Sequence, residues 1–155
     1  MKITKEGIDL IHDFERCVLE AYECPKSKEL PTSQKFWTIG WGNTYYADGS
    51  KVKEGDKITQ EQANRLFEIV LNNKIAQVKK LVPPTLNDNQ FSALISFVYN
   101  LGIGNFREST LLKRVIADKD DPDISYQFSR WINKGTSFET GLRRRRKAEA
   151  ELYFK

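Results

Sequence analysis

The chain changes from helical to strand periodicity within one short stretch, residues 13–44, and this change constrains its fold more than any other feature. Four residues spaced three, four and three apart predict one face of an α-helix over about residues 5–19: Ile8, Ile11, Glu15 and Val18. Three of them are apolar, so we expect the carboxyl group of Glu15 at the margin of a buried face. Loss of hydration there disfavours the charged form, and a general acid needs a proton held near neutral pH.

Two strands with a long connection are expected after this helix. Residues 21–24 form the first and residues 36–43 the second, with a polar, proline-punctuated loop over residues 25–35. In the second strand bulky side chains alternate with small ones, so one face of the strand is nearly bare. The residues on that face are Thr38, Gly40 and Gly42. A ligand can lie against such a backbone face. The alternative is that the glycines only permit a bend, and the strand alone does not decide between the two.

These residues resemble the active-site signature of the phage-type lysozymes, glycoside hydrolase family 24. In that family an acid follows Phe. After eight further residues comes an Asp or Cys, and then a strand that reads TIGYG or TIGWG. Here the signature stands as Phe14-Glu15, Cys24-Pro25 and TIGWG over residues 38–42. Further segments keep the family's order over nearly the whole chain: NQFSAL at 89–94, YNLG at 99–102, STLL at 109–112, and the stretch from Gly141-Leu142 to Leu152.

The resemblance implies an α+β, lysozyme-like fold, with a small β-hairpin lobe and a larger helical lobe joined by a long helix. Within a single domain, 1–155, we expect lobes at about 13–58 and 82–155, with the N-terminal helix packing on the helical lobe. The sequence itself favours a bridging helix over about 60–81, because Thr59 and Gln62 form a capping-box pattern and two prolines, Pro83-Pro84, stop it. A cleft between the lobes would hold an extended polymer.

The remaining segments are expected to be short elements. A turn at Asp48-Gly49 places Val52 in a third strand. Beyond Pro84 the periodicity predicts four helices: from Asn87 to about Tyr99, broken by Gly102 and Gly104; from Ser109 or Thr110; around 124–132; and over about 141–153.

The resemblance also implies a function. It points to a lysozyme, an N-acetylmuramidase that cleaves the β-1,4 bond between N-acetylmuramic acid and N-acetylglucosamine and serves as a phage or prophage endolysin in host cell lysis. Glu15 is then the general acid, Thr38 orients the attacking water, and Cys24 occupies the second catalytic position. Three neighbouring residues are expected to bind substrate: Gly40, Gly42 and Asn43.

The chain departs from the family pattern in ways that leave part of the chemistry open. A cysteine thiol is normally neutral at pH 7, so Cys24 leaves water activation, covalent capture and the stereochemical outcome undecided. Residues 25–37 separate Cys24 from Thr38, a longer connection than the family usually has, and we expect this inserted loop to line the cleft. Asn43 stands where His is common, which would weaken a supporting hydrogen bond.

Composition excludes several other classes. The chain has 155 residues, 39% hydrophobic and 30% charged, which is typical of a globular domain. His12 is the only histidine, no Cys and His have metal-ligand spacing, and no GxSxG motif occurs, so we expect no zinc site, no cofactor and no Ser-His-Asp triad. Two cysteines do not make a disulfide framework, and Cys17 is expected to pack as a small hydrophobe.

The charge leaves the partner open, because a net charge of +4 and a pI near 9.0 suit cell wall, nucleic acid and membrane surfaces alike. The basic run RRRR at 143–146 fits either a nucleic-acid patch or arginines paired with Glu149 or Glu151. Consecutive helical residues splay around the axis, which favours the structural interpretation.

Location and partners follow from the N-terminus and the resemblance. Acidic residues interrupt any apolar run there, and no segment approaches a membrane span. We expect a monomer made in the host cytoplasm that acts on peptidoglycan glycan strands after a holin-type membrane partner releases it, with no nucleic-acid partner and no stable membrane insertion. The rival hypotheses are a lytic transglycosylase, a non-catalytic wall-binding module and a basic nucleic-acid binder.

Overall fold

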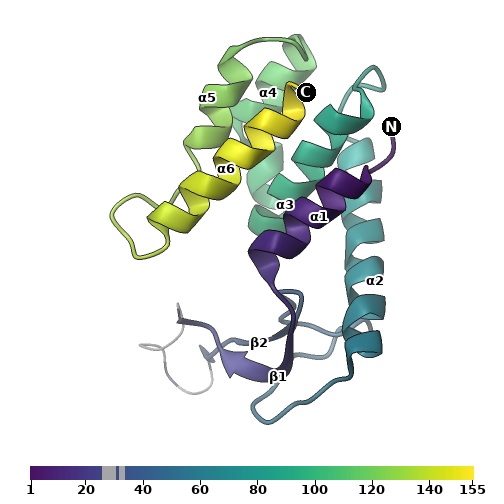
Figure 1. Cartoon of the computed structure of the whole chain (residues 1–155), viewed down its shortest axis with the longest axis vertical. Helices are drawn as coiled ribbons and strands as arrows, with labels where there is room; N and C mark the ends of the chain where they lie inside the picture. Colours follow the sequence, from purple (N-terminus) through teal and green to yellow (C-terminus); the bar gives the residue numbers. More distant parts are fainter. Residues whose placement is uncertain (26–30, 32–33) are drawn as a thin grey trace. The chain divides into compact units, whose positions relative to one another are not determined.

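The computed structural model describes residues 1–25, 31 and 34–155, so most of the predicted loop over 25–35 lies outside the described residues. Figure 1 shows the elements in chain order: α1 (Lys5–Glu15), β1 (Val18–Glu23), β2 (Trp37–Gly40), α2 (Gln60–Lys79), α3 (Asp88–Glu108), α4 (Thr110–Ala117), α5 (Asp123–Ser129) and α6 (Glu139–Tyr153). This mixture of helices with a small antiparallel sheet confirms the expected α+β class.

The chain divides into two compact units, which we call the helical unit and the hairpin unit. The helical unit contains Met1–Phe14 and Asn73–Lys155, and the hairpin unit contains Glu15–Asn72. Helix α2 begins in the hairpin unit and ends in the helical unit. The lobe and bridge boundaries given by the sequence stay a prediction.

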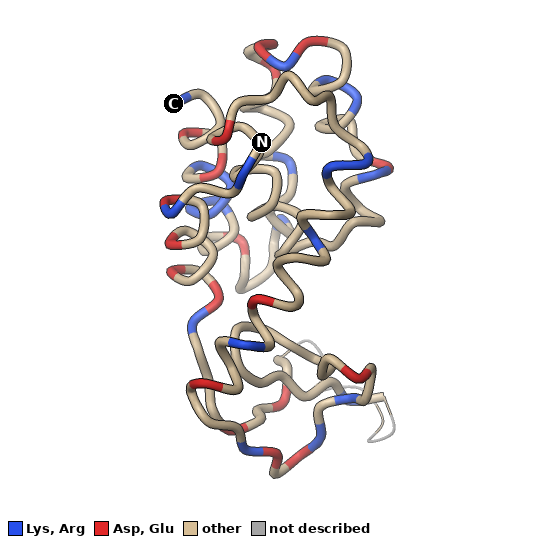
Figure 2. Tube along the Cα trace, turned by 90° about the vertical axis from the view of Figure 1, so that its right-hand side faces the viewer, with Lys and Arg blue, Asp and Glu red and all other residues tan. Residues whose placement is uncertain are grey.

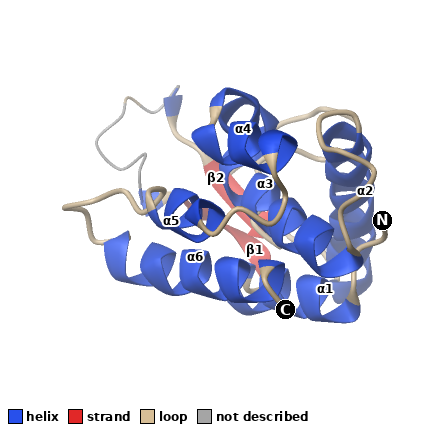
Figure 3. Cartoon of the chain, turned by 90° about the horizontal axis from the view of Figure 1, so that it is seen from above, coloured by secondary structure: helices blue, strands red, loops and turns tan. Residues whose placement is uncertain are grey.

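Helix α3 forms the core of the helical unit. Every residue from Gln90 to Val98 is buried, which is the pattern of a helix covered on all sides. It contacts α6, and α6 in turn contacts α5 (Figure 3). Three aromatic rings surround Phe97 with centroids 5.6–6.0 Å away: Phe106, Phe128 and Trp131.

The predicted glycine break falls within α3. Gly102 has φ 84° and ψ 158°, which interrupts the helical backbone as expected, whereas the second expected break, at Gly104, does not occur. The other predicted signals at the two ends of this segment are confirmed. Asn87 and Gln90 form a capping box at the start of α3, and the Ser109 side chain accepts a hydrogen bond from the Leu112 N–H at the start of α4.

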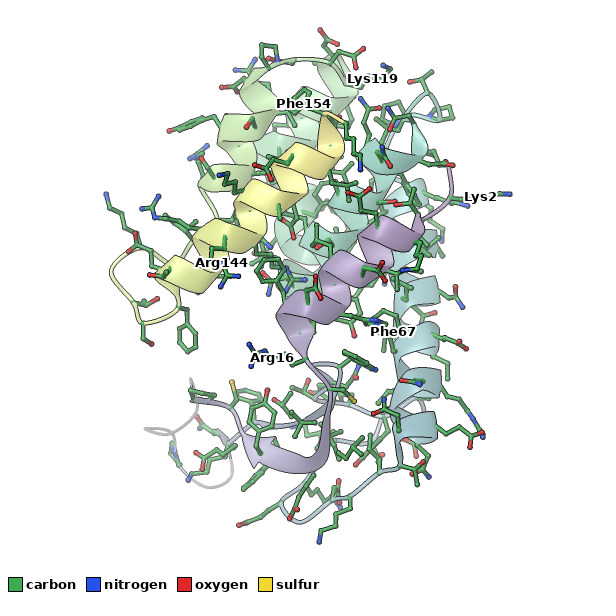
Figure 4. All side chains as sticks on the ribbon, viewed as in Figure 1. Lys2, Arg16, Phe67, Lys119, Arg144 and Phe154 are labelled. Atoms are coloured by element: carbon green, nitrogen blue, oxygen red, sulfur yellow. The ribbon has the colours of Figure 1, made fainter. Side chains whose placement is uncertain are left out.

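The arginine run is structural, as favoured from the sequence. Arg145 and Arg146 are buried and both form ion pairs with Glu149, whose side chain is fully buried. The Arg143 guanidinium pairs with Glu139 near the surface, and Arg144 is exposed on α6 (Figure 4). Elsewhere, Lys and Arg alternate with Asp and Glu along the chain in both units (Figure 2).

The hairpin unit begins where the first helix ends, and this end differs from the prediction. Helix α1 stops at Glu15 because Arg16 takes φ 52°, outside the helical region (Figure 4). Val18 therefore starts β1, and its predicted place on the helical face with Glu15 is wrong. Strand β1 pairs with β2 in antiparallel register, with an irregularity between Val18 and Tyr22.

The second predicted strand is shorter than expected, and the third does not form in the part of the chain that the structure describes. Strand β2 ends at Gly40 rather than at residue 43. Val52 is buried and its N–H donates to the Thr44 carbonyl (2.9 Å), but the described residues around it form only an isolated bridge between Tyr45 and Lys51. A third strand at Val52 is thus contradicted for this part of the chain.

Candidate active site

Glu15 lies against the backbone of Gly42. The two residues come from the end of α1 and from the turn after β2, and the Glu15 side chain is only partly exposed. A Cβ atom added to Gly42 would lie 2.6 Å from Glu15 Oε2, closer than real Cβ contacts occur. Gly42 also has φ +84°, a conformation that L side chains rarely adopt. The absence of a side chain at residue 42 therefore makes room for the carboxyl group.

A tight turn over residues 39–43 sets the position of Gly42. Ile39 and Asn43 each donate a backbone N–H to the other's carbonyl, both at 2.9 Å. Gly40 has φ +61°, and a Cβ atom on it would lie 3.2 Å from Asn43 Oδ1. Of the three residues expected to bind substrate, Gly42 is exposed, whereas Gly40 and Asn43 are buried. Their role in binding stays a prediction.

Trp41 fixes this turn to the first half of α2. Its Nε1–H donates to Asn64 Oδ1 at 3.2 Å, and its ring packs on Phe67 with centroids 6.0 Å apart. Asn64 Oδ1 also accepts a hydrogen bond from Gln60 Nε2 at 2.9 Å, and the same nitrogen lies 3.5 Å from Cys17 Sγ. Cys17 is half-buried beside a polar amide, in a less apolar environment than the sequence predicts.

The sheet brings Cys24 and Thr38 to one face. Tyr22 is paired with Thr38 across the two strands, and directly opposed residues of an antiparallel pair point to the same side. Cys24, two residues after Tyr22, belongs to that same side. The register continues past the strands, because the Cys24 N–H donates to the Phe36 carbonyl at 2.8 Å. Phe36 is 49% exposed and Tyr22 is 41% exposed.

All three predicted catalytic residues influence the pKa of the Tyr22 phenol. Burial raises the pKa of Tyr22 above its ordinary value, the neighbouring Cys24 and Glu15 raise it further, and a hydrogen bond with the Thr38 side chain lowers it. Three side chains from α1, the end of β1 and β2 thus act on one hydroxyl group. Cys24 is not part of a disulfide and is partly buried, and Thr38 is buried.

Comparison with known protein families identifies the family of this chain. Residues 12–149 match the family model described as phage lysozyme. The chain belongs to the phage lysozyme family. This membership confirms the resemblance found in the sequence.

Relatives of this phage lysozyme family member include several endolysins. The chain is 35% identical over 153 residues to the endolysin of Bacillus phage PZA, matching 99% of the chain and 55% of the relative. It is also 35% identical over 161 residues to the endolysin of Acyrthosiphon pisum secondary endosymbiont phage 1, with 99% and 98% covered. The chain spans about half the length of the endolysins of Bacillus phages PZA and B103, at 55% and 54%.

Solved structures of the family share the fold. An endolysin from Escherichia coli O157:H7 phage FAHEc1 has a TM-score of 0.83 at 33% identity, with 100% of this chain and 94% of that chain covered. The muramidase domain of SpmX from Asticaccaulis excentricus has a TM-score of 0.79 at 30% identity, with 99% of this chain and 98% of that chain covered. The lysozyme-like fold implied by the sequence is thereby confirmed.

Sequence reasoning on this phage lysozyme family member missed Tyr22. The available signal was its position two residues before Cys24, which places both on one face of a strand. Its pairing with Thr38 could not be foreseen, because it depends on the strand register. Within the described residues, no group of three or more His, Cys, Asp or Glu side chains is arranged to hold a metal ion. No helix in this part of the chain combines the length and apolar character needed to cross a membrane.

Proposed function

We propose that this protein is a peptidoglycan hydrolase, a muramidase that cleaves the β-1,4 bond between N-acetylmuramic acid and N-acetylglucosamine and serves as a phage or prophage endolysin. The observation that carries the proposal is the close fit of the Glu15 carboxyl group against Gly42, in the turn that follows the strand of Thr38. Strand register places Cys24 on the same side of the sheet as Thr38. Endolysin relatives with 32–35% identity, and a muramidase domain with the same fold, support it.

Glu15 is the proposed general acid. Cleavage of a glycosidic bond requires a proton on the leaving oxygen as the bond to the anomeric carbon breaks. The carboxyl group of Glu15 has limited freedom on the side where it meets the Gly42 backbone, which directs it toward one acceptor position. Thr38, whose hydroxyl group is held in the sheet, would orient the water that adds to the anomeric carbon.

Cys24 is proposed to occupy the second catalytic position. A neutral thiol accepts no proton from water, whereas a thiolate is both a base and a nucleophile. A base that directs water to the opposite face gives inversion, and a covalent intermediate gives retention. Following the anomer of the first product by proton NMR therefore distinguishes the two roles of Cys24.

Substrate is proposed to contact the turn over residues 39–43. The exposed backbone of Gly42 is adjacent to the Glu15 carboxyl group, where the scissile bond must lie. The buried Gly40 and Asn43 would support that contact by holding the turn, since Asn43 shares both backbone hydrogen bonds with Ile39.

Release is proposed to require a membrane partner of the holin type after synthesis in the host cytoplasm. This follows from the family's function as endolysins, whose substrate lies outside the inner membrane. Expression of the protein in bacteria alone, and together with a holin, tests it. Lysis only in the second case would support the proposal, and lysis by the protein alone would contradict it.

The central experiment measures release of reducing ends from purified peptidoglycan. We expect activity in the wild-type protein and none in Glu15→Gln, with an unchanged melting temperature. Glu20→Gln is the matched control, because Glu20 is an exposed carboxylate of the same unit, 3.9 Å from Lys57 Nζ. Hydrolysis by Glu15→Gln would refute the assignment of the acid.

Product analysis separates the rival functions in the same digest. A lytic transglycosylase releases anhydro-sugar products without consuming water, and mass spectrometry identifies them by their lower mass. A non-catalytic wall-binding module sediments with peptidoglycan but releases no reducing ends. Either result would overturn the muramidase proposal.

A further inference from the structure

We propose that Asn64 is a positioning residue for Glu15: its side-chain oxygen orients the turn that presents Gly42, and the contact with Gly42 in turn directs the carboxyl group. The inference deepens the proposed function and rests on it. Asn64 lies in the first half of α2 and is exposed. The inference is carried by two hydrogen bonds that its Oδ1 atom accepts and by the tight fit of Glu15 against Gly42.

The first of these hydrogen bonds orients the turn over residues 39–43. Asn64 Oδ1 accepts the Nε1–H of Trp41 at 3.2 Å, and Trp41 immediately precedes Gly42 in the chain. The Trp41 ring also packs on Phe67, with centroids 6.0 Å apart and planes inclined at 58°. Apolar packing depends mainly on the area buried, whereas a hydrogen bond weakens steeply as it departs from linearity. The packing therefore holds the turn near α2, and the bond to Asn64 fixes its direction.

The second hydrogen bond connects the same oxygen to the segment that follows Glu15. Gln60 Nε2 donates to Asn64 Oδ1 at 2.9 Å, and that nitrogen lies 3.5 Å from Cys17 Sγ. Cys17 is two residues after Glu15, between the end of α1 and the start of β1. One acceptor atom of Asn64 thus links the two segments that meet where Glu15 contacts Gly42.

The contact between Glu15 and Gly42 makes this link important for turnover. It has no spare room, because a Cβ atom on Gly42 would lie 2.6 Å from Glu15 Oε2. A small rotation of the turn therefore moves the carboxyl group, and a misplacement of about 1 Å can cost a catalytic step about a hundredfold in rate. Asn64 itself is exposed, so water replaces its hydrogen bonds when they are removed, and folding loses little. We therefore expect a role in turnover that is separate from stability.

Two substitutions separate the acceptor oxygen of Asn64 from the rest of its side chain. Asn64→Asp keeps an acceptor at the same place, and both hydrogen bonds described above use only that oxygen. Asn64→Leu keeps a similar shape, removes the acceptor and favours a helix at least as well as Asn. On purified peptidoglycan fragments we expect kcat to fall about tenfold in Asn64→Leu, with KM and the melting temperature unchanged, and to stay within about twofold of wild type in Asn64→Asp.

The matched control is Asn72→Leu, because Asn72 is an exposed amide of the same helix and the same unit. It should behave as wild type. A double-mutant cycle then tests whether Asn64 acts through Trp41. Trp41→Phe removes the indole N–H and keeps an aromatic ring, so it should lower kcat by a similar factor. Added to Asn64→Leu, it should cause little further loss, because the hydrogen bond is already absent.

Several results would overturn the inference. An unchanged kcat in Asn64→Leu, a change confined to KM, or a lower melting temperature would each do so, as would an equal loss in Asn64→Asp or additive losses in the cycle. A wild-type protein without hydrolytic activity would refute the proposed function, and this inference with it. An active wild type, an inactive Glu15→Gln and a fully active Asn64→Leu would refute this inference alone.

Discussion

The Oε2 atom of Glu15 lies 2.6 Å from the point that a Cβ atom on Gly42 would occupy, so the two residues fit together only because the second is glycine. We therefore expect Gly42→Ala to displace the carboxyl group and abolish most activity. Gly49→Ala is the control, since Gly49 has the same φ of +84° with nothing within 4 Å of its added Cβ.

Both glycine variants should lose about 1–2 kcal/mol of stability from the left-handed backbone, measured by urea denaturation. Only Gly42→Ala should also lose turnover of peptidoglycan. Equal activity in the two variants would show that contact with Gly42 does not position Glu15.

Phe36 gives a prediction about substrate binding. Its carbonyl accepts the Cys24 N–H, and its ring is 49% exposed, which suits packing against a sugar ring. We expect Phe36→Ala to raise KM several-fold and to leave kcat within about twofold. Phe154→Ala, at a ring 47% exposed in the helical unit, should leave both constants unchanged. An unaltered KM in Phe36→Ala would contradict this role.

Glu149 gives a prediction about stability. Burial raises the pKa of its carboxyl group, and Arg146, Arg145 and the Ser96 hydroxyl, which donates at 2.7 Å, lower it. Glu149→Gln removes the buried carboxylate with which both guanidiniums pair, so we expect a loss of about 3–5 kcal/mol in the free energy of unfolding.

The same helix supplies the control for that prediction. Glu139 pairs with Arg143 at 2.6 Å with its partner's side chain 57% exposed, and exposed pairs contribute less than about 1 kcal/mol. Unfolding in guanidinium chloride should therefore show a clearly larger loss of unfolding free energy in Glu149→Gln than in Glu139→Gln. Similar losses in both would mean that burial does not determine the effect.

Tyr46 gives a prediction at alkaline pH. Burial, together with its hydrogen bond to Asp56 (2.8 Å), raises the pKa of Tyr46 from 10.0 to about 12. The unfolded chain then releases the phenol proton first, so stability is complete below pH 10 and is lost as the pH rises toward 12. We expect Tyr46→Phe to flatten this fall in urea-denaturation free energies, and Tyr45→Phe to leave it unchanged. An equally steep fall in Tyr46→Phe would exclude this tyrosine as its source.

Local signals in the sequence predicted the helices of this chain well. Asn87 and Gln90 mark the start of α3 by their own side-chain hydrogen bonds, and Ser109 does the same for α4. Such caps involve residues three apart and need no tertiary information. The end of α1 was predicted four residues too late, because nothing near Arg16 in the sequence reveals its positive φ.

The candidate residues of the site could be named from the sequence, but the contacts that position them could not. Glu15, Cys24 and Thr38 were found from a family pattern, but the position of Glu15 depends on the turn that presents Gly42. The position of that turn depends on Trp41, which contacts α2 at residues more than twenty positions further along the chain. Tyr22 entered the site through strand register, which is set by non-local pairing.

The burial of Arg145 and Arg146 limits which cationic groups of the molecule can touch an anion directly. Arg145, Arg146 and Glu149 together hold one unit of the formal net charge of +4 away from solvent. Direct contacts with an anionic polymer are therefore open to the lysines and arginines on the exterior, Arg143 and Arg144 among them, and closed to Arg145 and Arg146.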